Sequence, residues 1–134
     1  MNRAFLCSAI EGLVSARGYN FQLDDDTHYP TSVCRYPAAF MAQPEFLSLE
    51  GRHHGRITYK LSLRLAQQGA KLTQTERNAL LDRMEQEAME LFVALSKERC
   101  VAVVDKLSIV PCTEAVDIHG AVAIEAKAQV TTIF

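Results

Sequence analysis

The chain has 134 residues, of which 49% are hydrophobic and 22% charged, and its formal net charge is -2. This length suits a single domain spanning residues 1–134, and the composition excludes an intrinsically disordered chain. Because the charge is nearly balanced, the chain has no general attraction to phosphate backbones or anionic lipid, and we expect no nucleic-acid or membrane partner.

The N-terminal segment predicts a helix followed by a strand. Apolar residues recur at steps of three and four from Arg3 to Arg17, and Gly18 follows directly. This spacing is typical of an amphipathic helix that ends at a glycine. Alternating apolar and polar residues over Tyr19–Leu23 then predict a short, half-buried strand that ends at an acidic turn. Glu11 and Arg17 interrupt the apolar start, so no export signal or membrane span is visible.

The segment from His28 to Glu50 is rich in proline and aromatic residues, which excludes one uninterrupted helix. We predict a strand over Ser32–Tyr36, an irregular crossing over Pro37–Pro44 and a second strand over Glu45–Glu50. A long irregular segment in a compact domain is uncommon unless it is functional. Its aromatic side chains either cover the core or form a protein-binding surface, and the sequence leaves both interpretations open.

The clearest strand signal covers Arg56–Ala66, where every second residue is apolar. This alternation predicts a strand with one buried and one solvated face. The preceding segment, Gly51–Gly55, has a glycine at each end, and this suits a hairpin turn that needs positive φ angles. We therefore expect Glu45–Glu50 and Arg56–Ala66 to form an antiparallel hairpin.

The second half of the chain predicts a long helix and another hairpin. Thr73 and Glu76 have the spacing of a capping box at the start of that helix, whose apolar stripe runs to Leu95. Strands are expected over Val101–Val110 and Ala121–Ile133. The predicted fold class is α+β, with a mostly antiparallel sheet of four to six strands packed against an N-terminal helix and a long central helix.

Candidate catalytic and metal-binding residues are few. His53 and His54 are adjacent and do not converge with a third ligand, and the acidic turn 24–26 with His28 lacks the spacing of a calcium loop. The four cysteines are scattered, which favours reduced thiols. Cys7 is expected as a small buried side chain, and Cys112 as an exposed one in a polar loop. No nucleotide, phosphate or zinc-hydrolase motif is present, so we predict no catalytic residue, metal or cofactor.

The order of these elements resembles that of phage tail-terminator and tail-completion (minor tail) proteins. The resemblance covers the first helix, Tyr36–Phe40 followed by Pro44, the glycine-flanked turn into Arg56–Leu63, the capped long helix and the closing hairpin. It implies a protein that is not an enzyme. It also implies a ring, commonly a hexamer, that caps the tail tube and contacts other tail or head-connector proteins. Such a subunit would lie in the bacterial cytoplasm during assembly and then in the virion tail.

The same resemblance implies that the sheet and the irregular segment form the subunit contacts. We choose the candidate protein-contact residues from their position and chemistry: Tyr36, Phe40, Met41, Phe46, Arg52 and His54. The main alternative is a small α+β module that binds a ligand or peptide as a monomer or dimer, with a pocket beside His28 or Tyr36. A further alternative is an enzyme that uses Cys112 or Cys34 with a histidine.

Overall fold

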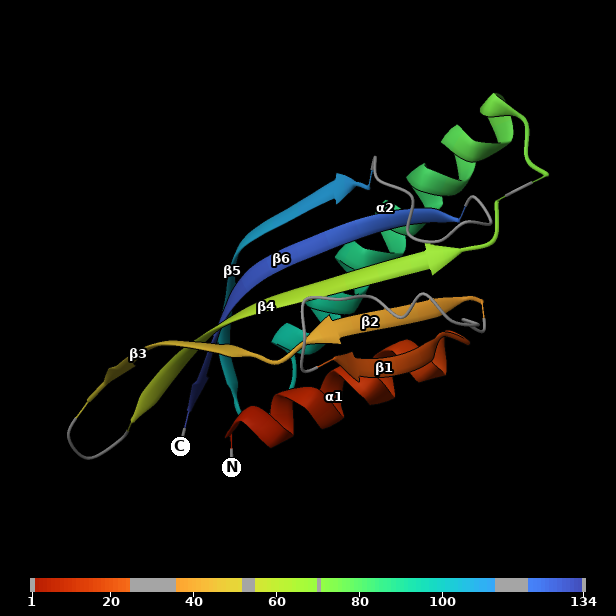
Figure 1. Ribbon diagram of the computed structural model, residues 1–134. Helices are drawn as coiled ribbons and strands as arrows, with labels where there is room; N and C mark the ends of the chain where they lie inside the picture. Colours follow the sequence, from red (N-terminus) through yellow and green to blue (C-terminus); the bar gives the residue numbers. More distant parts are fainter. Residues whose placement is uncertain (1, 25–35, 52–54, 70, 113–120, 134) are drawn as a thin grey trace.

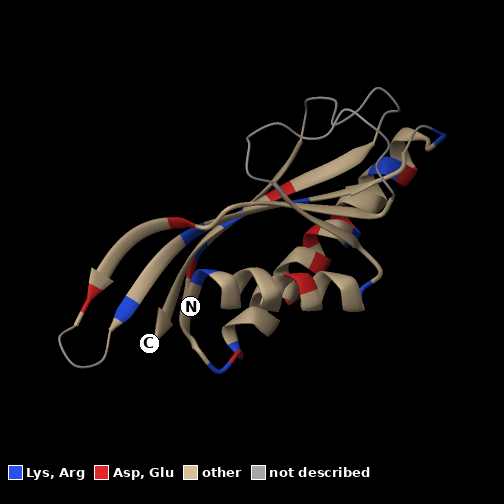
Figure 2. Cartoon of the chain, turned by 60° about the horizontal axis from the view of Figure 1, so that its bottom comes forward, with Lys and Arg blue, Asp and Glu red and all other residues tan. Residues whose placement is uncertain are grey.

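The computed structural model of the chain describes residues 2–24, 36–51, 55–69, 71–112 and 121–133. In these residues both helices lie on one face of a mostly antiparallel sheet (Figures 1 and 2). The elements in chain order are α1 (Asn2–Ala16), β1 (Asn20–Asp24), β2 (Ala38–Ala42), β3 (Glu45–Glu50), β4 (Arg56–Gln67), α2 (Gln74–Ser96), β5 (Val101–Pro111) and β6 (Val122–Ile133). The predicted α+β fold, with its two helices, is confirmed.

Strands β4 and β6 form the centre of the sheet. They pair antiparallel over their full length, from Arg56 opposite Ile133 to Gln67 opposite Val122. The strand order is β1-β2-β4-β6-β5. Strands β2 and β3 share one edge of β4: β3 pairs with residues 56–60 and β2 with residues 63–66. Strands β1 and β2 are parallel, whereas every other pair in the described part of the sheet is antiparallel.

The expected irregular crossing over Pro37–Pro44 is wrong, because Ala38–Ala42 forms strand β2. The two prolines lie outside the strand, so neither removes a donor from the sheet. Residues 38–41 are all buried, on both faces of β2, so the segment has no apolar–polar alternation by which it could be recognised. Apart from Tyr36, the strand predicted over Ser32–Tyr36 lies outside the described residues.

The main core lies between the sheet and the two helices. Its side chains come from the alternating positions of β4 and β6 and from one stripe of each helix, as the periodicity predicts. The largest contributors are Leu6, Ile10, Val14, Tyr59, Leu61, Leu63, Leu65, Leu80, Met84, Leu91, Phe92, Leu95, Ile124 and Val130.

The predicted capping box at the start of α2 is confirmed. The backbone N–H of Glu76 donates to Thr73 Oγ1 at 3.2 Å, and the backbone N–H of Thr73 donates to Glu76 Oε1 at 3.4 Å. Two backbone donors that have no partner within the helix are satisfied in this way.

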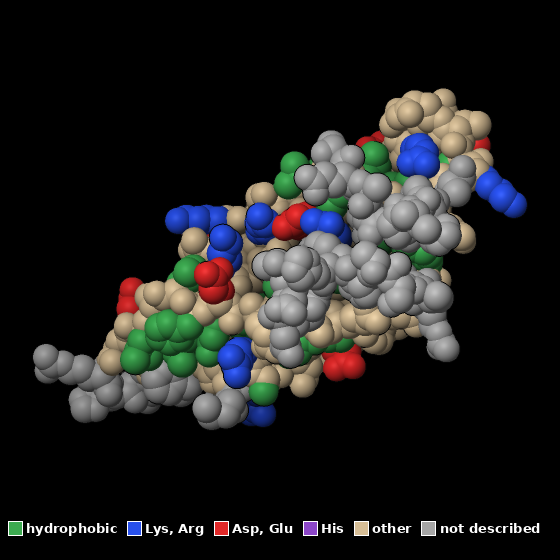
Figure 3. All heavy atoms as spheres, in the orientation of Figure 1, with side chains coloured by type: hydrophobic (Ala, Val, Ile, Leu, Met, Phe, Trp, Pro, Cys, Tyr) green, Lys and Arg blue, Asp and Glu red, His purple; other side chains and the backbone are tan. Residues whose placement is uncertain are grey.

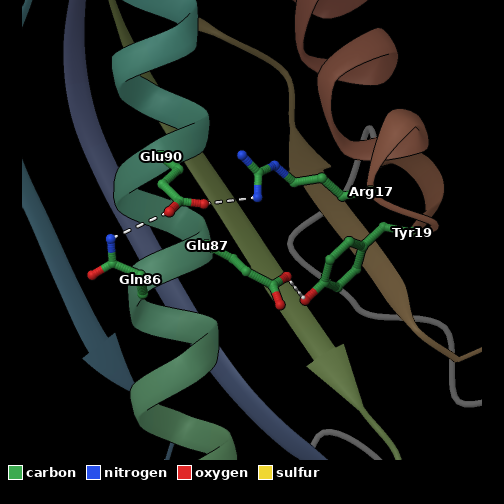
Figure 4. Close-up of polar contacts among 5 residues, drawn as sticks. All are labelled: Arg17, Tyr19, Gln86, Glu87 and Glu90. Atoms are coloured by element: carbon green, nitrogen blue, oxygen red, sulfur yellow. Dashed lines mark hydrogen bonds and ion pairs between the residues drawn. The ribbon is translucent and has the colours of Figure 1, made fainter.

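Polar contacts join the end of α1 and the start of β1 to α2 (Figure 4). Arg17 Nη1 donates to Glu90 Oε2 at 2.9 Å, and the Tyr19 hydroxyl donates to Glu87 Oε2 at 2.8 Å. Gln67 Nε2 at the end of β4 also donates to the Tyr19 hydroxyl, at 3.0 Å. Burial and the hydrogen bond to Glu87 raise the pKa of Tyr19 to about 12. Tyr19 thus connects β1, β4 and α2 through one neutral hydroxyl.

Candidate interaction surface

Strand β3 and the part of β4 that pairs with it project from the body of the molecule. We call these residues, 45–50 and 56–60, the β3–β4 arm. Figures 1 and 2 show the arm extending past the helices, which cover the rest of the sheet. All six residues of β3 are exposed, whereas Tyr59 on the paired part of β4 is buried in the core.

The exposed side chains of the arm include three large apolar ones. Phe46 is 58% exposed and Leu49 is 57% exposed, and Leu47 lies between them. Figure 3 shows hydrophobic side chains gathered at this end of the molecule. The Phe46 ring lies edge-on to Tyr59, with ring centroids 6.2 Å apart. Since Tyr59 belongs to the core, the exposed patch is continuous with the packed interior.

Strand β3 also leaves one of its backbone edges open. It pairs with β4 on one side, and no other described strand pairs with it. A register shift between Phe46 and Ser48 marks a bulge at Leu47. An edge strand with several exposed apolar residues is a site for pairing with another chain, which monomeric proteins usually avoid.

Charged residues occupy both ends of β3. Glu45 lies opposite Lys60 and Glu50 lies opposite Arg56, so each carboxylate faces a basic position across the hairpin. Opposite charges at directly paired positions favour this register of the hairpin. The charges therefore bracket the apolar patch formed by Phe46, Leu47 and Leu49.

Strand β5 forms the edge on the other side of the sheet. Its pairing with β6 shifts register between Asp105 and Ser108, and Lys106 within this shift has a φ of 53°. Val103, Leu107 and Val110 are exposed large apolar residues of this strand. In the described structure, the edge strands β3 and β5 each carry several exposed large apolar side chains, and the edge strand β1 carries one, Leu23.

The centre of the sheet face that carries no helix holds a charged cluster. Arg64 Nη2 and Lys127 Nζ approach the two oxygens of Glu125 at 3.0 and 3.4 Å, and Ser62 Oγ donates to Glu125 at 3.2 Å. Burial acts to raise the pKa of Glu125, but the hydrogen bond from Arg64 and the Lys127 charge outweigh it and lower the pKa. This cluster joins β4 to β6 and satisfies a partly buried carboxylate.

Two of the six expected contact residues belong to the core. Phe40 is 1% exposed and Met41 is 0% exposed, which leaves neither a surface to offer a partner. The physical reason is that β2 is an interior strand whose alternating side chains are covered on both faces. Met41 lies in the main core, and Phe40 packs in a second cluster with Ala38, Ala66 and Ala123.

The other expected contact residues have different positions. Phe46 is exposed on the arm, and Tyr36 is half-buried against the second cluster. Arg52 and His54 lie outside the described residues. The prediction omitted Leu47 and Leu49, which are exposed beside Phe46. The sequence feature that could have identified them is the largely apolar stretch between Glu45 and Glu50, which lacks strict apolar–polar alternation.

The candidate catalytic and metal-binding residues gain no support as a site. The described part of the chain contains no group of three or more histidine, cysteine or acidic residues that could hold a metal ion. Cys112 is half-buried against the Phe40 cluster instead of lying exposed in a polar loop. Cys7 is half-buried against the main core, and burial raises its pKa. The segments with Cys34, His28, His53 and His54 lie outside the described residues.

Two cavities are lined by described residues, and Tyr36 lines neither of them. One of about 260 Å³ lies where β4 leads into α2 and is lined by Gln68, Gly69, Lys71 and Leu72. Another, of about 10 Å³, lies among core residues of α1, β4 and α2 and is too small for a ligand. Neither matches the pocket that the ligand-binding alternative predicts beside Tyr36.

No protein-family model matches the chain, and no curated protein matches its sequence. Neither described helix is long and apolar enough to cross a membrane.

Proposed function

We propose that the chain is a structural subunit of a phage or prophage tail, which assembles with copies of itself into a ring that terminates or completes the tail tube. Its partners are then its own copies and other tail or head-connector proteins, and its function depends on surfaces and not on catalysis. It acts in the bacterial cytoplasm during assembly and afterwards in the virion tail. The resemblance in element order suggests this family, and the exposed surface supports a role in assembly.

The observation that carries the proposal is the exposure of strand β3. A subunit of a stable ring contributes a substantial, partly apolar interface, and that area is exposed when one subunit is considered alone. Phe46 and Leu49 are each more than half exposed on an edge strand that projects past the helices. In a monomer these apolar side chains stay in contact with water, whereas an assembling subunit buries them against its neighbour.

A ring also needs an interface made of two different surfaces. Identical subunits close into a ring when a contact between unlike patches repeats by rotation. The edges of the described sheet include two unlike strands, β3 and β5, each with several exposed apolar residues. A single small subunit therefore carries both halves of such a contact.

The native molar mass of the purified chain tests the proposal. We expect light scattering to give a multiple of the mass of one chain that rises with protein concentration, and electron microscopy to show annular particles. The double variant Phe46→Gln/Leu49→Gln should shift the protein to the monomer with little change in its melting temperature. Both side chains are largely exposed, so their replacement removes few core contacts.

The matched control is Met89→Gln/Val93→Gln on α2. These residues are 44% and 54% exposed, so the control removes apolar surface of similar exposure from another part of the molecule. It should assemble like the unmodified chain. A monomeric unmodified chain at every concentration would count against the ring and favour the ligand- or peptide-binding module. Assembly that persists in the arm variant would show that β3 does not carry the contact.

A further inference from the structure

We infer that strand β3 of one subunit pairs with strand β5 of the next, antiparallel, so that the sheet continues from one chain into its neighbour. The inference rests on the proposed function, because it names the two surfaces that meet in the ring. The occupant of the β3 edge is the segment Lys106–Pro111 of a second copy.

Backbone geometry allows the pairing. Strand β3 pairs with β4 only, and β5 with β6 only, within the part of the chain that the structure describes. Each strand therefore has one open side with backbone donors and acceptors. An extended segment that satisfies such groups adds main-chain hydrogen bonds, and side chains of both strands determine the register.

One antiparallel register matches the side chains of the two strands. With Ser48 opposite Ser108 of the second copy, Glu50 lies opposite Lys106. The same register places apolar residues opposite each other: Leu49 with Leu107, and Leu47 with Ile109. Leu47, Leu49 and Leu107 are exposed in the single chain, so the pairing buries side chains that have no cover there.

The alternatives in which a strand pairs with its own copy bring like charges together. A full-length antiparallel pair of two β3 strands places Glu45 opposite Glu50 at both ends. A full-length antiparallel pair of two β5 strands places Lys106 opposite Lys106. Like charges directly opposite each other destabilise a strand pair, and opposite charges stabilise it. The charges therefore disfavour self-pairing and favour the β3–β5 contact.

In this register, the helix-free faces of the two subunits' sheets lie on the same side. Ser48 lies opposite Thr58, and Thr58 lies opposite Thr131, on the face of the sheet without helices. Ser108 lies opposite Lys127, which shares that face with Thr131. Directly opposed residues of an antiparallel pair point to the same side, so pairing Ser48 with Ser108 places both helix layers on one side. A slip by one residue would reverse this match.

Disulfide trapping in the full chain tests the contact. In an equimolar mixture of Ser48→Cys and Ser108→Cys proteins, mild oxidation should give a covalent dimer joined through those two positions. Directly opposed residues of antiparallel strands have Cβ atoms about 4.5–5.5 Å apart, which is close enough for a disulfide after a small adjustment. Each variant alone should give no more dimer than the unmodified chain with its natural cysteines.

The matched control mixes Ser48→Cys with Ala102→Cys, an exposed position of β5 outside the proposed register. It should cross-link at the background rate. Rapid cross-linking of Ser48→Cys with itself would overturn the inference, because it requires β3 to pair with β3. If light scattering gives the mass of a ring but no disulfide forms between positions 48 and 108, this contact is wrong and the proposed ring still stands. A monomeric mass with no link at any concentration would overturn both.

Charge reversal gives a second, independent test. Glu50→Lys and Lys106→Glu should each weaken association, by roughly fivefold or less in dissociation constant, since each places like charges opposite each other. The double variant restores opposite charges and should recover most of the affinity. If the double variant instead associates more weakly than either single variant, the two residues are not paired.

Discussion

Replacing Phe40 with alanine should destabilise the fold far more than the same replacement at Phe46. Phe40 is 1% exposed among Ala38, Ala66 and Ala123, small residues that cannot fill the space a phenyl ring leaves. A buried phenylalanine replaced by alanine costs about 3–5 kcal/mol in unfolding free energy. For a chain of this size that corresponds to a melting temperature lower by about 10–20 °C. Phe46 is 58% exposed, so its replacement should cost about 1 kcal/mol or less.

Urea denaturation followed by circular dichroism measures both variants against the unmodified chain. Denaturation should be measured at a protein concentration at which the chain is monomeric, because assembly stabilises the folded state further. Native mass measured at higher concentration should then show the opposite ranking, with assembly lost for Phe46→Ala. Equal losses of stability at the two sites would refute the assignment of Phe40 to the core and Phe46 to the surface.

Three further predictions concern polar groups. The pKa of Tyr19 is raised from 10.0 to about 12 in the fold, so the stability it contributes is present below pH 10 and is lost as pH rises toward 12. Tyr19→Phe should remove this alkaline loss, and an unchanged alkaline profile would contradict the role of the hydroxyl. The pKa of Glu125 is lowered from 4.5, so its contribution is present above that pH and falls on acidification through the lowered pKa. Glu125→Gln should therefore reduce the acid dependence of the unfolding free energy, whereas an unaltered dependence would mean that the Arg64 contact is not maintained in solution. Thr73→Ala should cost about 1 kcal/mol by removing the helix cap, and Thr75→Ala, inside the first turn, should cost less; equal losses would argue against the capping box.

Because Phe40 is buried and Phe46 is exposed, substitutions at the two positions should affect different properties of the protein. Substitutions at Phe46 and Leu49 alter a surface that the monomer does not need for folding. Substitutions at Phe40 or Met41 alter packing on the two faces of β2 and should change assembly only through stability. A set of arm variants can therefore separate loss of assembly from loss of folding.

The sequence alone was sufficient for the elements whose pattern is local. The alternation in Arg56–Ala66, the apolar stripe up to Leu95 and the Thr73–Glu76 capping box predicted β4, α2 and its N-terminus. These signals depend on the repeat of one strand or helix and on contacts between residues close in the chain, so they are visible without the fold. The expected α+β class follows from their order.

Only the tertiary structure decided which apolar residues are covered. Ala38–Ala42 is an interior strand because β1 and β4 pair with its two edges. Met41 and Phe40 are buried because each packs in a core cluster, on opposite faces of this strand. Glu45–Glu50 pairs along the same edge of β4 but lies beyond the helices, and that exposed Phe46 and Leu49. The two segments are close in sequence, and each contains a phenylalanine. Their different burial depends on which distant elements reach them, and local periodicity carries no information about that.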